Sequence, residues 1–197
     1  MKKLFVLFVV CLFVSMLSVT SYAQLIPNGD GTVTDTDTNL MWLQDSNYAY
    51  TSGYDTGGGY MNWDAAMTWA NNLIYAGHND WRLPTTPGLT WGEVVNEGEM
   101  AHLYYDERIN ASTPFPFVNV QNFRYWTGTE YVPTIDRPDP DAAWDFNFHY
   151  GSQHDSHKDM FYLAWAVRDV ATVPEPTSLL LLGTGLAGLM GLRRKSH

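Results

Sequence analysis

The sequence predicts an α+β fold with two helices and small antiparallel sheets, and two patterns carry this prediction. Residues 144–150 and 161–168 alternate between large apolar side chains and polar or small ones, which is typical of half-buried strands. Between residues 63 and 74, apolar side chains instead recur at helical spacing. The rest of the middle region is rich in Gly, Asn, Asp and Thr, as in a compact domain with many loops.

The first part of this region predicts a hairpin. Turn-forming residues 28–31 lead into a short strand over 32–34, and the polar turn 35–39 connects it to a strand over 40–43. The turn is acidic, but it lacks the alternating acids and the closing Glu of a helix-loop-helix calcium site. We therefore expect a solvated turn rather than a metal loop.

The helix over residues 63–74 has recognisable ends. Asn62 can cap its N-terminus, Asp64 in the first turn faces the positive end of the helix dipole, and Gly77 can close it. The apolar stripe, which we expect to face the core, consists of Trp63, Ala66, Met67, Ala70, Leu73 and Ile74.

A short strand with Trp81 and Leu83 pointing inward is expected next. A second helix is expected from Thr90, because Thr90 and Glu93 match a capping box, with a further helical turn over residues 99–105.

The C-terminal half is expected to be mainly strands and loops. Residues 123–127 are typical of a strand, and the Pro- and Asp-rich residues 132–141 of a loop. The strands 144–150 and 161–168 are expected to pair antiparallel across a polar loop, 151–159, with one face buried.

The N-terminus has the pattern of a signal peptide. Lys2 and Lys3 precede an apolar stretch over residues 4–14, and small residues follow. We expect signal peptidase to cut between Ala23 and Gln24, with an uncleaved anchor helix as the alternative. This leaves an exported domain over residues 24–170.

Residues 171–197 have the pattern of a sorting tail. Pro174, Glu175 and Pro176 precede a 16-residue apolar stretch over 177–192. As a helix this stretch would be about 24 Å long, which is short for a permanent membrane span. An ordinary C-terminal anchor is the alternative. The basic end of the tail consists of Arg193, Arg194 and Lys195. By the positive-inside rule this end should stay cytoplasmic, which places the domain outside the inner membrane.

Charge and cysteine content exclude several classes of function. Six of the eleven Lys and Arg, but twenty of the 21 Asp and Glu, lie between residues 24 and 172, so this region carries a formal charge of −14. Such a field repels nucleic acid and anionic lipid, and it suits cations, cationic partners or neutral sugars. The only cysteine is Cys11, which leaves no thiolate metal site, thiol nucleophile or disulfide in the exported domain.

Several motifs together resemble the Lcl C-terminal domain family over roughly residues 30–169. They are residues 32–35, 40–42, 80–85, 125–129 and 164–168. The resemblance implies a C-type-lectin-like or formylglycine-generating-enzyme-like fold. Asn39 stands where the family usually has Gly, and it tolerates the same left-handed turn. The family often has Glu-Leu soon after Leu-Pro-Thr, whereas residues 86–89 of this chain are Thr-Pro-Gly-Leu.

The tail resembles the PEP-CTERM sorting signal of Gram-negative bacteria. This resemblance implies an exosortase as a processing partner, transient anchoring in the inner membrane, and a producer that makes exopolysaccharide. The cysteine pair of formylglycine-generating enzymes is missing, so the fold resemblance does not bring that activity.

Catalytic residues are not apparent. No nucleophile elbow or zinc-protease motif occurs. Four carboxylates could form the acid pair of a glycoside hydrolase, namely Glu97, Glu99, Asp106 and Glu107. The charged faces of short helices explain these residues better. A second cluster of polar residues has side chains that could bind zinc or nickel, but we favour a solvated loop. The cluster comprises His149, His154, Asp155, His157 and Asp159.

Binding residues are easier to nominate. Exposed aromatic rings can stack on sugars, and the loop-side candidates are Trp91, Trp126 and Tyr131. Four other tryptophans are expected in the core, namely Trp42, Trp81, Trp144 and Trp165. Calcium is a further candidate ligand, at the acidic loop that contains Asp136, Asp139 and Asp141.

We therefore expect an exported, non-enzymatic cell-surface or biofilm-matrix protein that is a candidate for polysaccharide binding. The alternatives are an extracellular glycan hydrolase and a purely structural surface protein.

Overall fold

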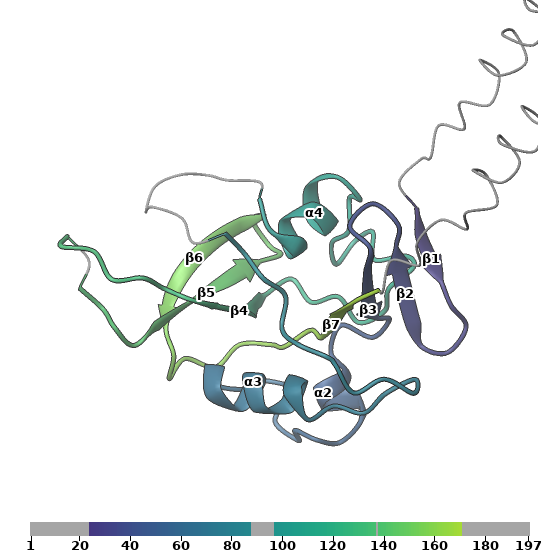
Figure 1. Cartoon of the computed structure of the whole chain (residues 1–197), viewed down its shortest axis with the longest axis horizontal. Coiled ribbons are helices and arrows are strands. Elements are labelled where there is room, and N and C mark those ends of the chain that lie inside the picture. The colour runs from purple at the N-terminus through teal and green to yellow at the C-terminus, as the bar shows by residue number, and fades with distance from the viewer. Residues whose placement is uncertain (1–23, 88–96, 137, 171–197) are drawn as a thin grey trace, which may run out of the picture.

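The computed structural model describes residues 24–87, 97–136 and 138–170, and within them the predicted α+β class is confirmed (Figure 1). Two small antiparallel sheets lie at opposite sides of the domain, with α4 on one side and α2 and α3 on the other. The elements are β1 Leu25–Pro27, β2 Thr32–Asp35, β3 Leu40–Leu43, α2 Tyr48–Thr51, α3 Trp63–Asn71, α4 Glu99–Tyr105, β4 Arg124–Glu130, β5 Ala142–Asn147, β6 Ser152–His157 and β7 Val167–Asp169.

The first sheet has the strand order β1-β2-β3-β7 and contains the predicted hairpin. Its turn is held by Asp35, whose Oδ1 accepts hydrogen bonds from the backbone N–H of Asp37 at 3.0 Å and of Thr38 at 3.4 Å. Asn39 adopts the left-handed conformation with φ 55°, as expected for a residue that replaces Gly. The local sequence therefore determines this turn.

The second sheet corrects two predictions. Residues 152–157, expected in a loop, form the edge strand β6 and pair with β5 over its whole length. Residues 161–168 do not pair with 144–150; only their end forms a strand, β7, which pairs with β3. The all-polar sequence of β6 hid the strand, because an edge strand with half-exposed side chains on both faces needs no apolar alternation.

Residues 162–166 are nevertheless extended and buried between the two sheets, whereas Phe161 is 62% exposed. Leu163 exchanges backbone hydrogen bonds with β4, from its N–H to Arg124 O at 3.1 Å and from Trp126 N–H to its own carbonyl at 2.9 Å. Tyr162 exchanges two more with Met61. The apolar alternation thus comes from burial of this segment in the core, not from pairing in a hairpin.

Helix α3 begins as predicted and ends earlier. Asn62 caps it, because its Oδ1 accepts the Ala65 N–H at 2.9 Å. The helix stops at Asn71, so the predicted apolar stripe is too long, and Ile74 is 77% exposed. Gly77 does not close the helix but lies in a separate turn between Tyr75 and His78.

Indole rings make up much of the core. Trp42, Trp81, Trp144 and Trp165 are buried as predicted, and Trp42 packs edge-on against Trp165 with ring centroids 5.2 Å apart. The N–H of Trp165 donates to Leu43 O at 2.8 Å, which ties the ring to the first sheet. Large rings with one satisfied polar atom allow a domain without disulfides to bury much apolar surface.

Helix α4 confirms the helical turn predicted over residues 99–105. The helix expected from Thr90, the signal peptide and the C-terminal tail lie outside the described residues. In the part of the chain that the structure does describe, no helix is long and apolar enough to cross a membrane.

Burial of Asp145 in β5 gives the domain a pH-dependent stability. Its side chain is fully buried, and burial raises its pKa to about 7, although Arg124 and Ser156 favour the charged form. Because the folded state holds this proton more tightly than the unfolded state, the stabilisation is present at low pH. It is lost as the pH rises through 7.

We predict that the unfolding free energy of residues 24–170 falls by about 1 kcal/mol per pH unit between pH 5 and 7 through this group. Asp145→Asn should flatten that slope, and Asp136→Asn in an exposed loop should leave it unchanged. Urea unfolding at several pH values measures both. Identical pH profiles for the wild type and Asp145→Asn would refute the assignment.

Candidate functional site

The aromatic residues predicted to contact glycan are not on the surface. Trp126 is completely buried in the main core, where its N–H donates to Met61 O at 2.9 Å. Tyr131 is only 4% exposed and packs against Trp144 in a small second cluster. The prediction is therefore wrong for these two residues, because β4 continues to Glu130 and carries both segments inward. Trp91 lies outside the described residues.

A different pair of rings is exposed. Tyr60 and Phe123 are about two-fifths exposed, and their ring centroids lie 5.3 Å apart at an interplanar angle of 84°. Tyr60 directly precedes Met61, which pairs with Tyr162, and Phe123 directly precedes β4. We call Tyr60 and Phe123 the aromatic patch. The sequence offered little signal for it, since Tyr60 follows three glycines and Phe123 stands between Asn122 and Arg124.

Polar groups adjoin the aromatic patch. Phe123 packs against Tyr162 with ring centroids 6.1 Å apart, and the Arg124 guanidinium lies 5.5 Å above the Tyr162 ring. Arg124 also contacts Asp145 at 3.3 Å, so its charge is partly balanced while more than a quarter of its side chain stays exposed. On the residue before Phe123, the Asn122 amide contacts His149 Nδ1 at 2.6 Å. Rings and hydrogen-bonding groups thus occur together at this end of the second sheet.

The acidic loop proposed for calcium does not form a compact ligand set. Asp136 and Asp141 are exposed, and Asp139 Oδ1 accepts the backbone N–H of Asp141 at 3.0 Å. Among the described residues, three metal-ligating side chains come within 4.8 Å of one another at a different place, which includes none of these aspartates. Calcium binding at this loop stays a prediction.

The histidine cluster is spread along β6 and the residues around it. His154 Nε2 contacts Ser152 Oγ at 2.9 Å, and burial lowers the pKa of His154. His157 Nδ1 contacts Asp159 Oδ1 at 2.7 Å, a bond that raises the pKa of His157. His149 contacts Asn122 instead, so these side chains bind separate partners and do not converge on one point.

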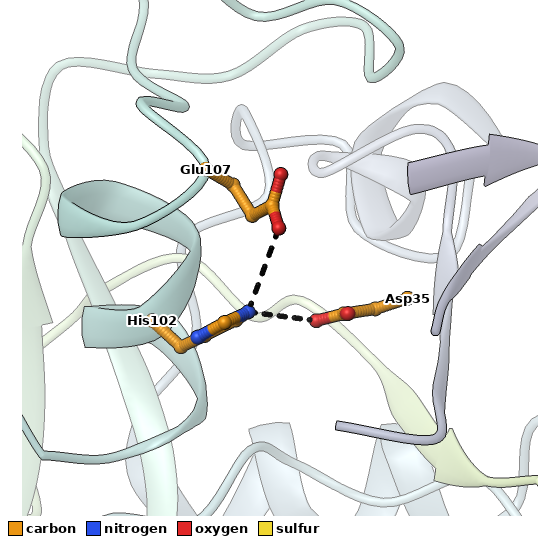
Figure 2. Close-up of side chains that lie close together, drawn as sticks. All are labelled: Asp35, His102 and Glu107. Atoms are coloured by element: carbon orange, nitrogen blue, oxygen red, sulfur yellow. Dashed lines mark ion pairs between the residues drawn. The ribbon is translucent and has the colours of Figure 1, made fainter. Parts of the chain in front are cut away.

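Three of the four carboxylates considered for hydrolysis contact basic side chains. Glu99 binds Arg82, and Asp106 Oδ2 contacts His102 Nδ1 at 2.9 Å. Glu107 points from the end of α4 towards the other ring nitrogen of His102, which Asp35 also approaches (Figure 2).

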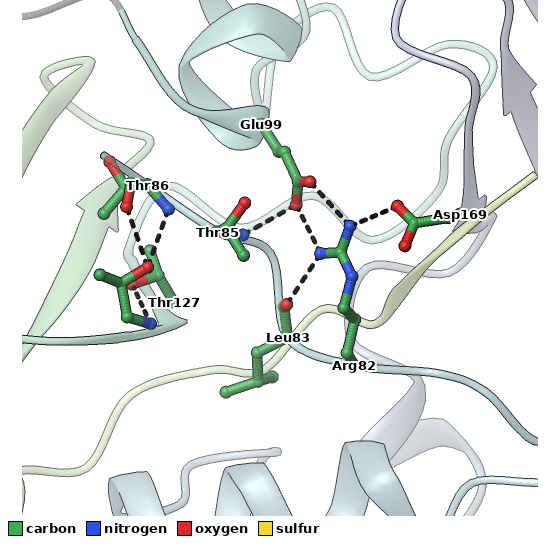
Figure 3. Close-up of polar contacts among 8 residues, drawn as sticks. Arg82, Leu83, Thr85, Thr86, Glu99, Thr127 and Asp169 are labelled. Carbon is green, nitrogen blue, oxygen red and sulfur yellow. Dashed lines mark hydrogen bonds and ion pairs between the residues drawn. The ribbon is translucent and has the colours of Figure 1, made fainter. Parts of the chain in front are cut away.

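Arg82, in the Trp-Arg-Leu-Pro-Thr segment, is the centre of a structural network (Figure 3). Its two terminal nitrogens each lie 2.8 Å from a different oxygen of Glu99 in α4, and Nη2 also lies 2.8 Å from Asp169 Oδ1 in β7. The same Glu99 accepts the Thr85 N–H at 2.8 Å. These bonds to Glu99 raise the pKa of Arg82, so the guanidinium stays charged.

The segment after Arg82 is bound to the second sheet as well. Thr129 Oγ1 accepts the Thr86 N–H at 3.0 Å and donates to Thr86 O at 2.9 Å, and Gly128 N–H donates to Pro84 O at 2.8 Å. Figure 3 shows Thr86 beside Thr127 on β4, away from Arg82. The segment therefore joins α4 and both sheets, and its polar groups are used for structure.

Comparison with known families supports both resemblances. The family model of the Lcl C-terminal domain matches residues 31–168, and that of the PEP-CTERM protein-sorting motif matches residues 172–195. No curated protein matches the chain significantly. The sorting motif indicates a secreted protein of Gram-negative bacteria that an exosortase processes.

We predict that Glu99→Gln lowers the unfolding free energy by about 2 kcal/mol, because it leaves the partly buried Arg82 without its bidentate partner. Asp80→Asn is the matched control. Asp80→Asn removes a similarly short contact to Arg168, but the Asp80 carboxylate is more than half exposed. This variant should therefore lower the unfolding free energy by less than about 1 kcal/mol. Urea unfolding compares the two variants; equal costs would contradict a special role for Arg82.

Proposed function

Because the chain belongs to the Lcl C-terminal domain family and carries a PEP-CTERM motif, we propose that it is a non-enzymatic surface or matrix protein that binds neutral polysaccharide. The supporting observation is the aromatic patch, where two partly exposed rings, Tyr60 and Phe123, pack against each other beside polar side chains. Exposed rings beside polar groups are typical of binding surfaces. A C-type-lectin-like relationship of the two-sheet fold is part of the same proposal.

The charge of the domain narrows the class of glycan. A formal charge of −14 over residues 24–172 repels anionic polymers, while the hydroxyl groups of a neutral sugar require only hydrogen-bonding partners and a ring face. Arg124 beside the patch, with more than a quarter of its side chain exposed, supplies such a partner. Binding to a neutral glycan should also depend little on salt.

We predict that residues 24–170 bind the producer's own exopolysaccharide with saturable heat in titration calorimetry, with little change at high salt. The double substitution Tyr60→Ala and Phe123→Ala should weaken binding at least about tenfold, since it removes both rings, each worth of order 1 kcal/mol. Tyr54→Ala, at another exposed tyrosine, is the control that should bind like the wild type.

Each outcome distinguishes the alternatives. Release of reducing sugar during long incubation would support the hydrolase instead. If the titration shows no binding heat and no sugar is released, the remaining alternative is a purely structural surface protein. Loss of binding in the Tyr54→Ala control as well would contradict the assignment to the aromatic patch.

The sorting tail makes a separate prediction. We expect the exosortase to recognise the motif through Pro174, Glu175 and Pro176. The double substitution Pro174→Ala and Pro176→Ala should keep a C-terminal epitope tag on the chain in the producer's membrane fraction. The wild type should lose the tag. Changing Pro138 and Pro140 to Ala tests whether any proline pair matters; retention of the tag in that control would contradict a specific role of the motif.

A further inference from the structure

Three side chains from two elements converge beside the first sheet (Figure 2). Asp35 ends β2, His102 lies in α4, and Glu107 follows α4. His102 Nε2 is 3.3 Å from Asp35 Oδ2 and 3.7 Å from Glu107 Oε1, and the three atoms lie within 4.8 Å of one another. This group was not anticipated from the sequence, because Asp35 is 67 positions away from His102.

Each of the three converging atoms is buried and lacks a hydrogen-bond partner. The Asp35 side chain is 1% exposed, and its other oxygen, Oδ1, already holds the hairpin turn. Its Oδ2 is thus aimed into the group, close to His102 Nε2 but without a hydrogen bond. Buried polar atoms without partners are rare in folded proteins, since each loses its hydration without compensation.

Asp106 determines which atom of His102 faces the group. Its Oδ2 lies 2.9 Å from His102 Nδ1, and a carboxylate can only accept, so Nδ1 carries the proton. In the neutral ring, Nε2 then presents a lone pair towards two carboxylates. This carboxylate–histidine arrangement is the one that orients histidine ligands towards metals.

The distances and donor types favour one kind of cation. Zinc binds His nitrogen and carboxylate oxygen at about 2.0–2.1 Å in a tetrahedron, which places neighbouring ligand atoms about 3.3–3.4 Å apart. The 3.3 Å between Asp35 Oδ2 and His102 Nε2 matches that spacing, and the 3.7 Å between Glu107 Oε1 and the same nitrogen is close to it. Asp35 Oδ2 and Glu107 Oε1 lie within 4.8 Å of each other, so they would move closer together around the ion. Calcium instead requires six to eight oxygen ligands, so a site with one nitrogen and two oxygens does not suit it.

Electrostatics point the same way. The Asp35 and Glu107 carboxylates both face His102 Nε2 and are largely removed from solvent. Two carboxylates held so close repel each other unless a cation or a shared proton lies between them. His102 is the only basic group among the three, and its nitrogen is not placed to donate to either carboxylate with hydrogen-bond geometry.

We propose that Asp35, His102 and Glu107 bind one Zn²⁺, with Asp106 as the positioning residue behind His102. A fourth ligand would be water. The metal would cross-link the hairpin of the first sheet to α4, in a domain whose described residues contain no cysteine. This site is structural and independent of the proposed glycan binding.

The test is competition for Zn²⁺ between the full chain, in detergent micelles, and a chromophoric chelator. We expect one Zn²⁺ per chain. His102→Ala and Glu107→Gln should each weaken binding by at least about tenfold, and Asp106→Asn by about tenfold. Zn²⁺ should also raise the unfolding temperature of the wild type but not of His102→Ala. Glu107→Gln preserves the size of the side chain, so its result stands even if His102→Ala does not fold.

The matched control is His157→Ala, which removes an exposed histidine that also contacts a carboxylate. It should bind Zn²⁺ like the wild type, and equimolar Ca²⁺ should not displace the zinc. Absence of saturable binding would mean that the group is an ion pair only. That result, equal weakening by His157→Ala, or displacement by Ca²⁺ would each overturn the proposal.

Discussion

The bidentate contact between Arg82 and Glu99 is the interaction on which the arrangement of the domain depends. Short helices and three- or four-residue strands have little stability alone, so their positions must be fixed by tertiary contacts. Arg82 satisfies this need at one point, because its side chain binds α4 and β7 while its backbone exchanges two hydrogen bonds with Val167. The Trp-Arg-Leu-Pro-Thr segment is therefore explained by architecture rather than by catalysis.

The tryptophan core has a consequence for function. Trp42, Trp126 and Trp165 are completely buried, with two of their indole N–H groups bonded to backbone carbonyls of other segments. Rings used in this way are unavailable to a ligand. The proposed glycan binding must then depend on the smaller rings left at the surface and on the polar side chains beside them. The net negative charge of the domain fits a neutral ligand better than an anionic one.

The sequence predicted the parts of the fold in which local chemistry determines local structure. The Asn62 cap, the hairpin closed by Asp35 and Asn39, and the burial of four tryptophans all followed from residue type and spacing. It failed where tertiary context decides. Nothing in the polar sequence of β6 distinguishes an edge strand from a loop, and residues 161–168 look like a sheet strand because burial in a core produces the same alternation. Trp126 was misplaced for a related reason, since the inward course of β4 is not visible in its sequence.

The candidate sites show the same division. Sequence spacing grouped neighbours such as His154 and His157, which the structure separates onto different partners. Spatial convergence instead joined Asp35 to His102 and Tyr60 to Phe123, pairs far apart in the chain. Such pairs become visible only when the sheets and α4 are placed relative to one another.

The claim that the aromatic patch is the glycan-binding surface is tested most directly by an NMR titration that follows ring carbon–hydrogen signals. With the producer's exopolysaccharide added to residues 24–170, the signals of Tyr60 and Phe123 should shift progressively, while those of Trp42 and Trp165 in the core should not. Shifts confined to other surface residues, or none at all at saturating glycan, would contradict the claim.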